Sequence, residues 1–226
     1  MVERRYWCCL AVDGEELVGI KLFLNILLWL WYHTSMQFNH PARTIEDPPI
    51  ARLLFASTSS SWLWFFVRLY VGAVWVEAGW AKVTSAVWTG SKAGVALSGF
   101  IQGALQKTVG EHPDVQGWYA WFLENVVLPN ASLWAHVVAW GELAVGIALV
   151  LGAFTGIAAF FAGFMNLNFL LAGAVSVNPV LFTLSVGLML AWKVAGYLGC
   201  DYFLLPLLGT PWSSAPSVSS SGDRST

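Results

Sequence analysis

Charged residues and cysteines are both scarce in this chain. Asp, Glu, Lys and Arg make up 11% of the 226 residues, whereas soluble domains carry about 25%. The net charge of −2 offers no basic surface for a nucleic acid. The three cysteines, Cys8, Cys9 and Cys200, form no C-x-x-C pair, which argues against a zinc site and against a disulfide framework. Nucleic-acid-binding proteins and disulfide-rich domains are therefore excluded as classes.

Motifs for tightly bound redox groups are missing as well. A b-type haem held by two histidines needs both within the apolar segments, and only His136 lies in one. The chain has no C-x-x-C-H sequence, no G-x-G-x-x-G after a strand and no phosphate loop. The sequence therefore indicates no haem, no metal and no nucleotide, and any electrons would pass to a diffusible acceptor, a partner subunit or a thiol.

Apolar and aromatic residues are abundant instead. Hydrophobic residues make up 57% of the chain, and 14 residues are Trp. So many Trp side chains suit rings that lie between an apolar and an aqueous phase. The composition is that of an integral membrane protein in contact with a lipid bilayer.

Four long apolar stretches predict membrane spans. A bilayer core of about 30 Å needs about 20 apolar residues in a helix. The stretches of this length are residues 62–82, 133–154, 155–175 and 179–198. We therefore predict an all-α membrane protein, a four-transmembrane-helix bundle within a membrane domain of residues 47–212.

The segment 83–132 lies between the first two spans and has helical periodicity of its own. Apolar residues recur at helical spacing from Ala93 to Leu105 and again from Val115 to Val127, on either side of Gly110–Pro113. We predict an outward-facing amphipathic helical insertion that caps the bundle. Packing on the membrane surface and a lid over a substrate are both compatible with this pattern.

The two ends of the chain differ in composition from the predicted membrane domain. Residues 1–46 form an N-terminal extension, in which 17–32 is apolar but short. This stretch is an extra helix, or residues 1–35 are an upstream extension before an ordinary start at Met36; the sequence leaves both open. The Ser-rich tail 213–226 has no reason to fold.

Basic residues near the span ends predict the orientation. Arg43 and Arg52 precede the first span, and Lys193 lies near the end of the last. By the positive-inside rule, both termini are expected on the cytoplasmic side of the cell membrane.

Polar residues inside the spans are the candidate site. Because a charge in hydrocarbon costs several kcal/mol, each needs a partner or a wet cavity. Counting residues along the spans predicts an outer polar layer made of Glu77, Glu142, Asn166 and Asn168, with Lys82 and His136 near its mouth. An inner layer would hold Arg68 and Lys193, with Lys193 reaching the surface. Cys200, at the inner end of the last span, is expected to be a buried bystander.

Two interpretations of the outer layer compete. Glu77 and Glu142 could accept protons beside a bound quinone or a sulfur anion, and we assign them the catalytic role. The predicted binding residues are Arg68, Lys82, His136, Asn166 and Asn168. Alternatively, these groups hold helices together by hydrogen bonds across small-residue contacts, which is the better interpretation for the two asparagines. The small residues in question are Gly72, Gly79, Gly141 and Gly146.

Several motifs resemble those of a known family. The segments Arg68-Leu-Tyr-Val-Gly72 and Glu77-Ala-Gly-Trp-Ala-Lys82 look like the first-helix signature of the DoxX/DoxD membrane proteins. Trp140-Gly-Glu-Leu-Ala-Val-Gly146 resembles the second-helix pattern, and Asn178-Pro179 and Gly199-Cys-Asp201 are also similar. The long segment between the first two spans resembles the DoxD-like branch, the large subunit of thiosulfate:quinone oxidoreductase. The resemblance covers about residues 47–212.

This resemblance implies a four-helix membrane bundle that oxidises thiosulfate to tetrathionate and passes electrons to the quinone pool. It also implies a small partner subunit, DoxA. In this hypothesis, Lys82, Lys92 and His112 attract the sulfur anion from outside, while Glu77 and Glu142 take up the protons of the quinol. The alternative is a non-catalytic membrane subunit or scaffold of a larger respiratory or redox complex, which the lack of cofactor motifs favours.

Overall fold

The computed structural model of the protein describes residues 25–29 and 47–209. The chain divides into two units between Asp47 and Pro48. In the first unit, residues 25–29 are helical and exposed. The remainder of the predicted 17–32 helix and the tail 213–226 lie outside the described residues. The second unit is described to residue 209 and contains all of the predicted site residues.

The regular structure of this second unit is all helical, and no strand occurs among the residues that the structure describes. The all-α prediction is therefore confirmed. The α-helices are α2 (Pro49–Ala56), α3 (Ser61–Val83), α4 (Val95–Leu105), α5 (Gly117–Phe122), α6 (Ala131–Leu151), α7 (Thr155–Leu171), α8 (Asn178–Leu190), α9 (Trp192–Ala195) and α10 (Asp201–Leu207), and a π-helix covers Leu123–Val127.

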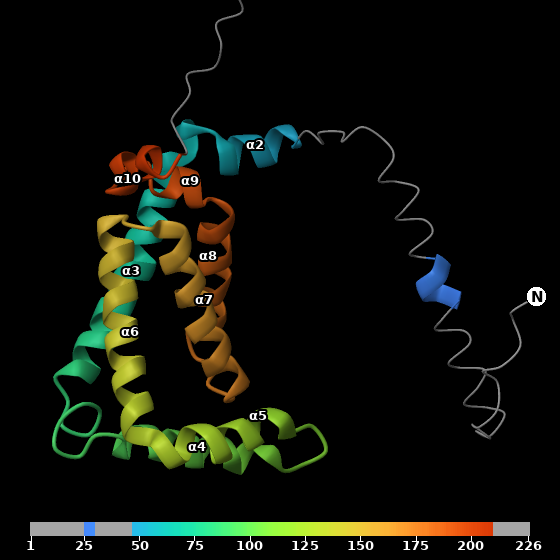
Figure 1. Ribbon diagram of the computed structural model, residues 1–226, viewed down its shortest axis with the longest axis vertical. Helices are drawn as coiled ribbons and strands as arrows, with labels where there is room; N and C mark the ends of the chain where they lie inside the picture. The colour runs from blue at the N-terminus through green and yellow to red at the C-terminus, as the bar shows by residue number, and fades with distance from the viewer. Residues whose placement is uncertain (1–24, 30–46, 210–226) are drawn as a thin grey trace, which may run out of the picture. The chain divides into compact units, whose positions relative to one another are not determined.

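Helices α3, α6, α7 and α8 run side by side, and shorter helices lie across their two ends (Figure 1). α4 and α5 cross one end of this bundle, while α2, α9 and α10 lie at the other. The tight turn from α6 to α7 depends on Gly152, whose φ of 66° suits a residue without a Cβ at a helix C-terminus. Pro179 opens α8, where its missing N–H costs no hydrogen bond.

The two cap helices are present where the periodicity predicts them, but the last predicted span differs. Helix α8 ends at Leu190, and Ala191 (φ −91°, ψ 15°) separates it from the short α9. The predicted span 179–198 is thus two helical pieces followed by a turn. The apolar run contains no proline or polar cluster at Ala191 that could have predicted the break.

Among the described residues, one helix is both long enough and apolar enough to cross a membrane. It is the continuous helical run Gly117–Leu151, which contains α5, the π-helix and α6. A second candidate arises if Pro49–Ala56 and Thr58–Val83, which are bent by 61°, count as one span. Thr155–Leu171 and Asn178–Leu190 are apolar but shorter.

Helices α3 and α6 pack closely because glycines line their contact. A Cβ on Gly79 would lie 2.7 Å from Leu143 Cα, and one on Gly72 would lie 3.1 Å from Gly146 O. These distances are too short for a side chain, so the two backbones touch directly, as small residues allow in membrane helices. Three of the four predicted small-residue contacts therefore occur, at Gly72, Gly79 and Gly146.

Adding one methyl group to this contact is expected to destabilise the bundle. A Cβ on Gly146 would lie 2.8 Å from the carbonyl carbon of Trp75, so Gly146→Ala forces two helix backbones apart. We expect a loss of about 1–3 kcal/mol in the free energy of unfolding, the usual cost of overpacking. Gly99→Ala is the matched control, because a Cβ there has no neighbour within 4 Å. Unfolding both variants in detergent with increasing SDS measures the difference, and equal stability would contradict the close contact.

Candidate functional site

Arg68 binds the backbone at the end of α6, and its Nε keeps no hydrogen-bond partner among the described residues. Its side chain is buried, and Nη1 donates to the carbonyl oxygens of Leu149 and Val150. Nη2 donates to Leu198 O at 2.9 Å. The last carbonyls of a helix lack partners within that helix and carry partial negative charge. Arg68, predicted to bind a cofactor, therefore ties the C-terminal end of α6 to the chain that follows α9.

Asp201 completes this arrangement from the other side. Its two carboxylate oxygens accept hydrogen bonds from Phe154 N (2.6 Å) and Thr155 N (2.7 Å), the first backbone amides of α7. Asp201 is buried, whereas the preceding Cys200 is exposed. The prediction that Cys200 is buried is therefore wrong. Consecutive helical residues point about 100° apart, so turning the carboxylate into the bundle turns the thiol out of it.

An ion pair lies toward the capped end. Lys82 Nζ is 2.6 Å from Glu142 Oε2, and this ion pair joins the last turn of α3 to the middle of α6. The Glu142 side chain is 1% exposed and that of Lys82 19%. Nζ also lies 5.2 Å above the ring of Trp88, a distance suited to a cation–π contact. The structure thus brings together two of the predicted outer-layer residues.

Glu77 is not part of this pair. Its side chain is exposed on α3, while the face of α3 toward α6 is formed by Gly72, Val76 and Gly79. Counting residues along a span gives depth but not the direction around the helix axis, which changes by about 100° per residue. The predicted layer in which Glu77 faces the bundle interior with Glu142 is therefore corrected to one without Glu77.

The two asparagines occupy different surroundings. Asn166 is fully buried, and neither amide atom has a hydrogen-bond partner in the described part of the chain. Asn168 lies on a different side of α7. Its Nδ2 donates to Phe164 O at 2.8 Å, and its Oδ1 accepts from the Tyr119 hydroxyl, 3.1 Å away. Asn168 is thus fixed by the cap, and Asn166 is not.

The two remaining predicted polar residues, His136 and Lys193, contact backbone oxygens and an aromatic ring, respectively. His136 Nδ1 lies 2.8 Å from Ser132 O, and Nε2 lies 3.2 Å from Thr89 O in the loop after α3. Its position ties that loop to α6. Lys193 is exposed and lies over the ring of Trp192, at 5.4 Å from its centroid, as a lysine that reaches the surface should.

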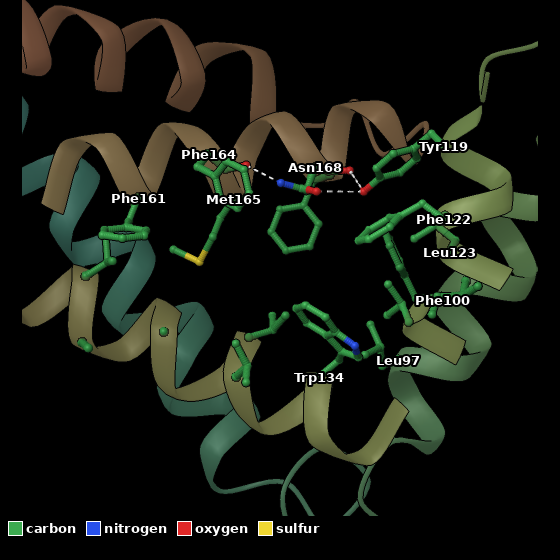
Figure 2. A pocket seen from close by; sticks show the side chains of 18 residues that line it. Leu97, Phe100, Tyr119, Phe122, Leu123, Trp134, Phe161, Phe164, Met165 and Asn168 are labelled. Carbon is green, nitrogen blue, oxygen red and sulfur yellow. Dashed lines mark hydrogen bonds between the residues drawn. The ribbon is translucent and has the colours of Figure 1, made fainter. Parts of the chain in front are cut away.

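An apolar pocket of about 510 Å³ lies between the cap and the helices α6 and α7 (Figure 2). Aromatic rings from the cap, α6 and α7 point into it from opposite sides. Its wall residues are Leu97, Phe100, Ile101, Tyr119, Phe122, Leu123, Val127, Trp134, Val137, Val138, Gly141, Ala144, Val145, Phe161, Phe164, Met165, Asn168 and Phe169. Of the predicted site residues, only Asn168 is among them.

One end of the pocket is polar. The Tyr119 hydroxyl lies 3.0 Å from the backbone O of Asn168 and 3.1 Å from its Oδ1, as the dashed lines in Figure 2 partly show. A phenol donates one hydrogen bond and keeps its lone pairs for other donors. Glu142 lies directly after Gly141, which lines the pocket. The pocket thus joins a long apolar wall to a hydroxyl and an amide, with a buried ion pair one residue behind the wall.

Sequence reasoning missed Tyr119, Trp134 and the other rings of the pocket. The helical spacing of the apolar residues in the cap predicts an apolar face. It does not show whether that face is packed against other side chains or borders a cavity. The predicted site residues are charged or polar, whereas the walls of this pocket are almost entirely apolar, so the charged residues do not mark its position.

A sequence model described as DoxX matches residues 63–175, which is about half of the chain. The match runs from α3 to the turn after α7 and so includes Lys82, Glu142 and the pocket. No curated protein and no solved structure matches the chain. Together with the long apolar helix and the exposed aromatic residues, the match shows that the chain is a membrane protein and belongs to the DoxX family.

Proposed function

We propose that this protein is the membrane subunit of an oxidoreductase, which binds a quinone under the cap and passes to it electrons from a sulfur compound such as thiosulfate. The observation that carries the proposal is the pocket of about 510 Å³, apolar along its walls and polar at Tyr119 and Asn168. Ligand pockets for lipid-like molecules have this combination of apolar walls and a few placed polar groups.

The residues of the pocket fit a quinone. Phe100, Phe122 and Trp134 offer ring faces on which a flat head group can stack. The Tyr119 hydroxyl has one proton, which it donates to Asn168; a quinone carbonyl oxygen would replace Asn168 as its acceptor. Val137, Phe161 and Phe164 line the pocket and are also exposed, so an isoprenoid tail can leave between α6 and α7 into lipid.

A quinone accepts two electrons and two protons, and two thiosulfate ions that join as tetrathionate release two electrons. The part of this chain is to orient the head group at Tyr119 and to supply protons from Glu142. Because reduction of a quinone consumes protons, this is the reverse of the uptake of quinol protons that the sequence assigned to Glu142. Oxidation of the sulfur anion is assigned to an outer site shared with a DoxA-like subunit. Lys92 and His112, both exposed in the cap loops, would attract the anion to this site.

We place α3, α6, α7 and the α8–α9 pair as four spans with the cap on the outer side and both termini in the cytoplasm of the cell. α3 has 23 residues, α6 21 and α7 17, and spans need about 17–25. Large apolar side chains are exposed along these helices, among them Trp62, Phe66 and Tyr70 on α3. Such a surface is stable against lipid and costly in water.

A structural role is the second candidate, and the Lys82–Glu142 pair favours it. A buried ion pair between α3 and α6 can hold two membrane helices together, whether or not a reaction takes place nearby. In that case the chain is a non-catalytic subunit or scaffold of a larger respiratory or redox complex.

Filling the pocket is expected to abolish quinone binding. At Gly141 an added Cβ meets only Met165 Sδ, at 3.8 Å, so Gly141→Leu extends into the cavity without a backbone clash. We expect the Kd of the purified protein for a short-chain quinone to rise roughly tenfold or more, as expected when over 1.4 kcal/mol of apolar contact is lost. The measurement is equilibrium binding in lipid nanodiscs, alongside thiosulfate-dependent quinone reduction by the complex.

Gly99→Leu is the control, because Gly99 lies on α4 away from any neighbour within 4 Å. Unchanged binding in Gly141→Leu would remove the pocket from the proposal. Wild-type binding without turnover in the intact complex would favour the structural role.

A further inference from the structure

Five buried side chains keep polar atoms that have no hydrogen-bond partner in the described part of the chain. Two of them, Arg68 (Nε) and Thr155 (Oγ1), belong to the end of the bundle at Asp201. The other three are Trp75 (Nε1), Glu142 (Oε1) and Asn166 (Nδ2 and Oδ1), and we call them the polar layer. Their exposed fractions are 3%, 0% and 0%. An unpaired buried polar atom costs about 1–3 kcal/mol, and roughly 90% or more of such atoms in proteins are bonded to protein or to ordered water.

Glu142 and Asn166 each follow a residue that contacts the other helix of the α6–α7 hairpin. Helices α6 and α7 form a tight hairpin, and a Cβ on Gly141 would lie 3.8 Å from Met165 Sδ. Each of these two contact residues immediately precedes a member of the polar layer. Because Glu142 and Asn166 are both fully buried, both side chains turn from this contact toward the interior of the bundle.

Trp75 is the member of the polar layer on α3. Its ring stacks on Phe169 of α7, with the centroids 6.5 Å apart and the planes at 24°. Phe169 is three residues after Asn166, hence on the same side of α7. The indole therefore lies against the α7 face that carries Asn166.

The unpaired atoms are complementary to water. The Trp75 N–H and the Asn166 amide group donate, whereas Glu142 Oε1 and Asn166 Oδ1 accept. A buried water molecule makes about three hydrogen bonds and settles where polar atoms would otherwise be unpaired. Water both donates and accepts, so it can bond either kind of atom.

The polar layer lies between the surface and the pocket. On one side, the other oxygen of Glu142 binds Lys82, which is partly exposed at the end of α3. On the other side, Gly141 and Met165, the chain neighbours of Glu142 and Asn166, line the pocket. The polar layer is thus adjacent along the chain both to a partly exposed cation and to the wall of the pocket.

We propose that the polar layer binds buried water and conducts protons from Lys82 through Glu142 to the quinone pocket, an inference that rests on the proposed function. In one transfer, the Lys82 ammonium would pass a proton to the Glu142 carboxylate, which would release it through the water toward the pocket. Lys82 would then regain a proton from the aqueous side, which restores the ion pair. Trp75 and Asn166 are positioning residues that hold the water.

The test uses the intact complex in nanodiscs and measures three quantities: quinone affinity, the rate of quinone reduction, and the ratio of this rate in H₂O to that in D₂O. Asn166→Leu keeps the branched shape of the side chain and replaces both amide atoms by methyl groups, and Trp75→Phe removes the indole N–H together with one of its two rings. Ser185→Ala is the matched control, since Ser185 is buried on α8 and its hydroxyl bonds Leu181 O of its own helix.

We expect Asn166→Leu to bind quinone within twofold of the wild type, to reduce it roughly tenfold or more slowly, as when a proton-transfer group is lost, and to raise the H₂O/D₂O ratio. Trp75→Phe should change rate and ratio in the same direction by less, and Ser185→Ala should change neither. Normal rates and ratios in both layer variants would overturn the proton path while the quinone site stands. Absence of quinone binding to the wild type would instead overturn the proposed function, and the path with it.

Discussion

Asp201→Ala is expected to lower the free energy of unfolding by about 3–5 kcal/mol, because removal of one charge from a buried, hydrogen-bonded arrangement leaves its partners uncompensated. The substitution removes the acceptors of Phe154 N and Thr155 N. It also removes the negative charge that acts on the buried guanidinium of Arg68. Both losses occur where α6, α7 and α10 meet, so the expected result is a bundle that opens at this end.

SDS titration of the purified protein in detergent, followed by its helical circular dichroism, measures this loss. Asp201→Asn should be intermediate, because the amide keeps one acceptor oxygen but no charge. Asp114→Ala is the control, since Asp114 is exposed in the cap loop. If Asp201→Ala unfolds at the same SDS fraction as Asp114→Ala, the hydrogen bonds to α7 contribute little and Arg68 is held by backbone carbonyls alone.

The sequence predicted the helices better than the side-chain roles. Apolar runs of span length marked the cores of α3, α6 and α7, because burial in lipid or in a bundle imposes that composition. Asp201 was noticed only as part of a motif. Its role depends on α10 folding back against the α6–α7 turn, where Cys200 N donates to Leu151 O and Asp201 N to Gly152 O. Nothing local to residues 199–201 encodes that long-range contact.

The site shows the same division. Depth along the spans placed Lys82 and Glu142 close together, and they form an ion pair. The same count also placed Glu77 there, because it ignored the direction of each side chain around the helix axis. The pocket could not be predicted at all, since its walls come from the cap, α6 and α7, and an apolar face looks the same in sequence whether it is packed or borders a cavity.

The Lys82–Glu142 pair gives the second large effect. Lys82→Met is expected to cost about 3–5 kcal/mol of unfolding free energy, because it leaves the buried Glu142 carboxylate without its partner. The double variant Lys82→Met/Glu142→Leu should recover most of this loss, since replacing a whole buried ion pair by apolar side chains is often neutral or stabilising. Lys92→Met, at an exposed lysine of the cap loop, is the control for stability.

Stability alone cannot separate an ion pair that joins helices from one that moves protons, but the double variant can. If Lys82 and Glu142 only hold α3 to α6, apolar replacements that restore stability must also restore quinone reduction by the complex. If Glu142 supplies protons to the pocket, the restored bundle still binds quinone, because neither side chain lines the pocket, and reduction stays slow by about 100-fold or more. Quinone reduction by a stable double variant is therefore the measurement that distinguishes a catalytic membrane subunit from a scaffold.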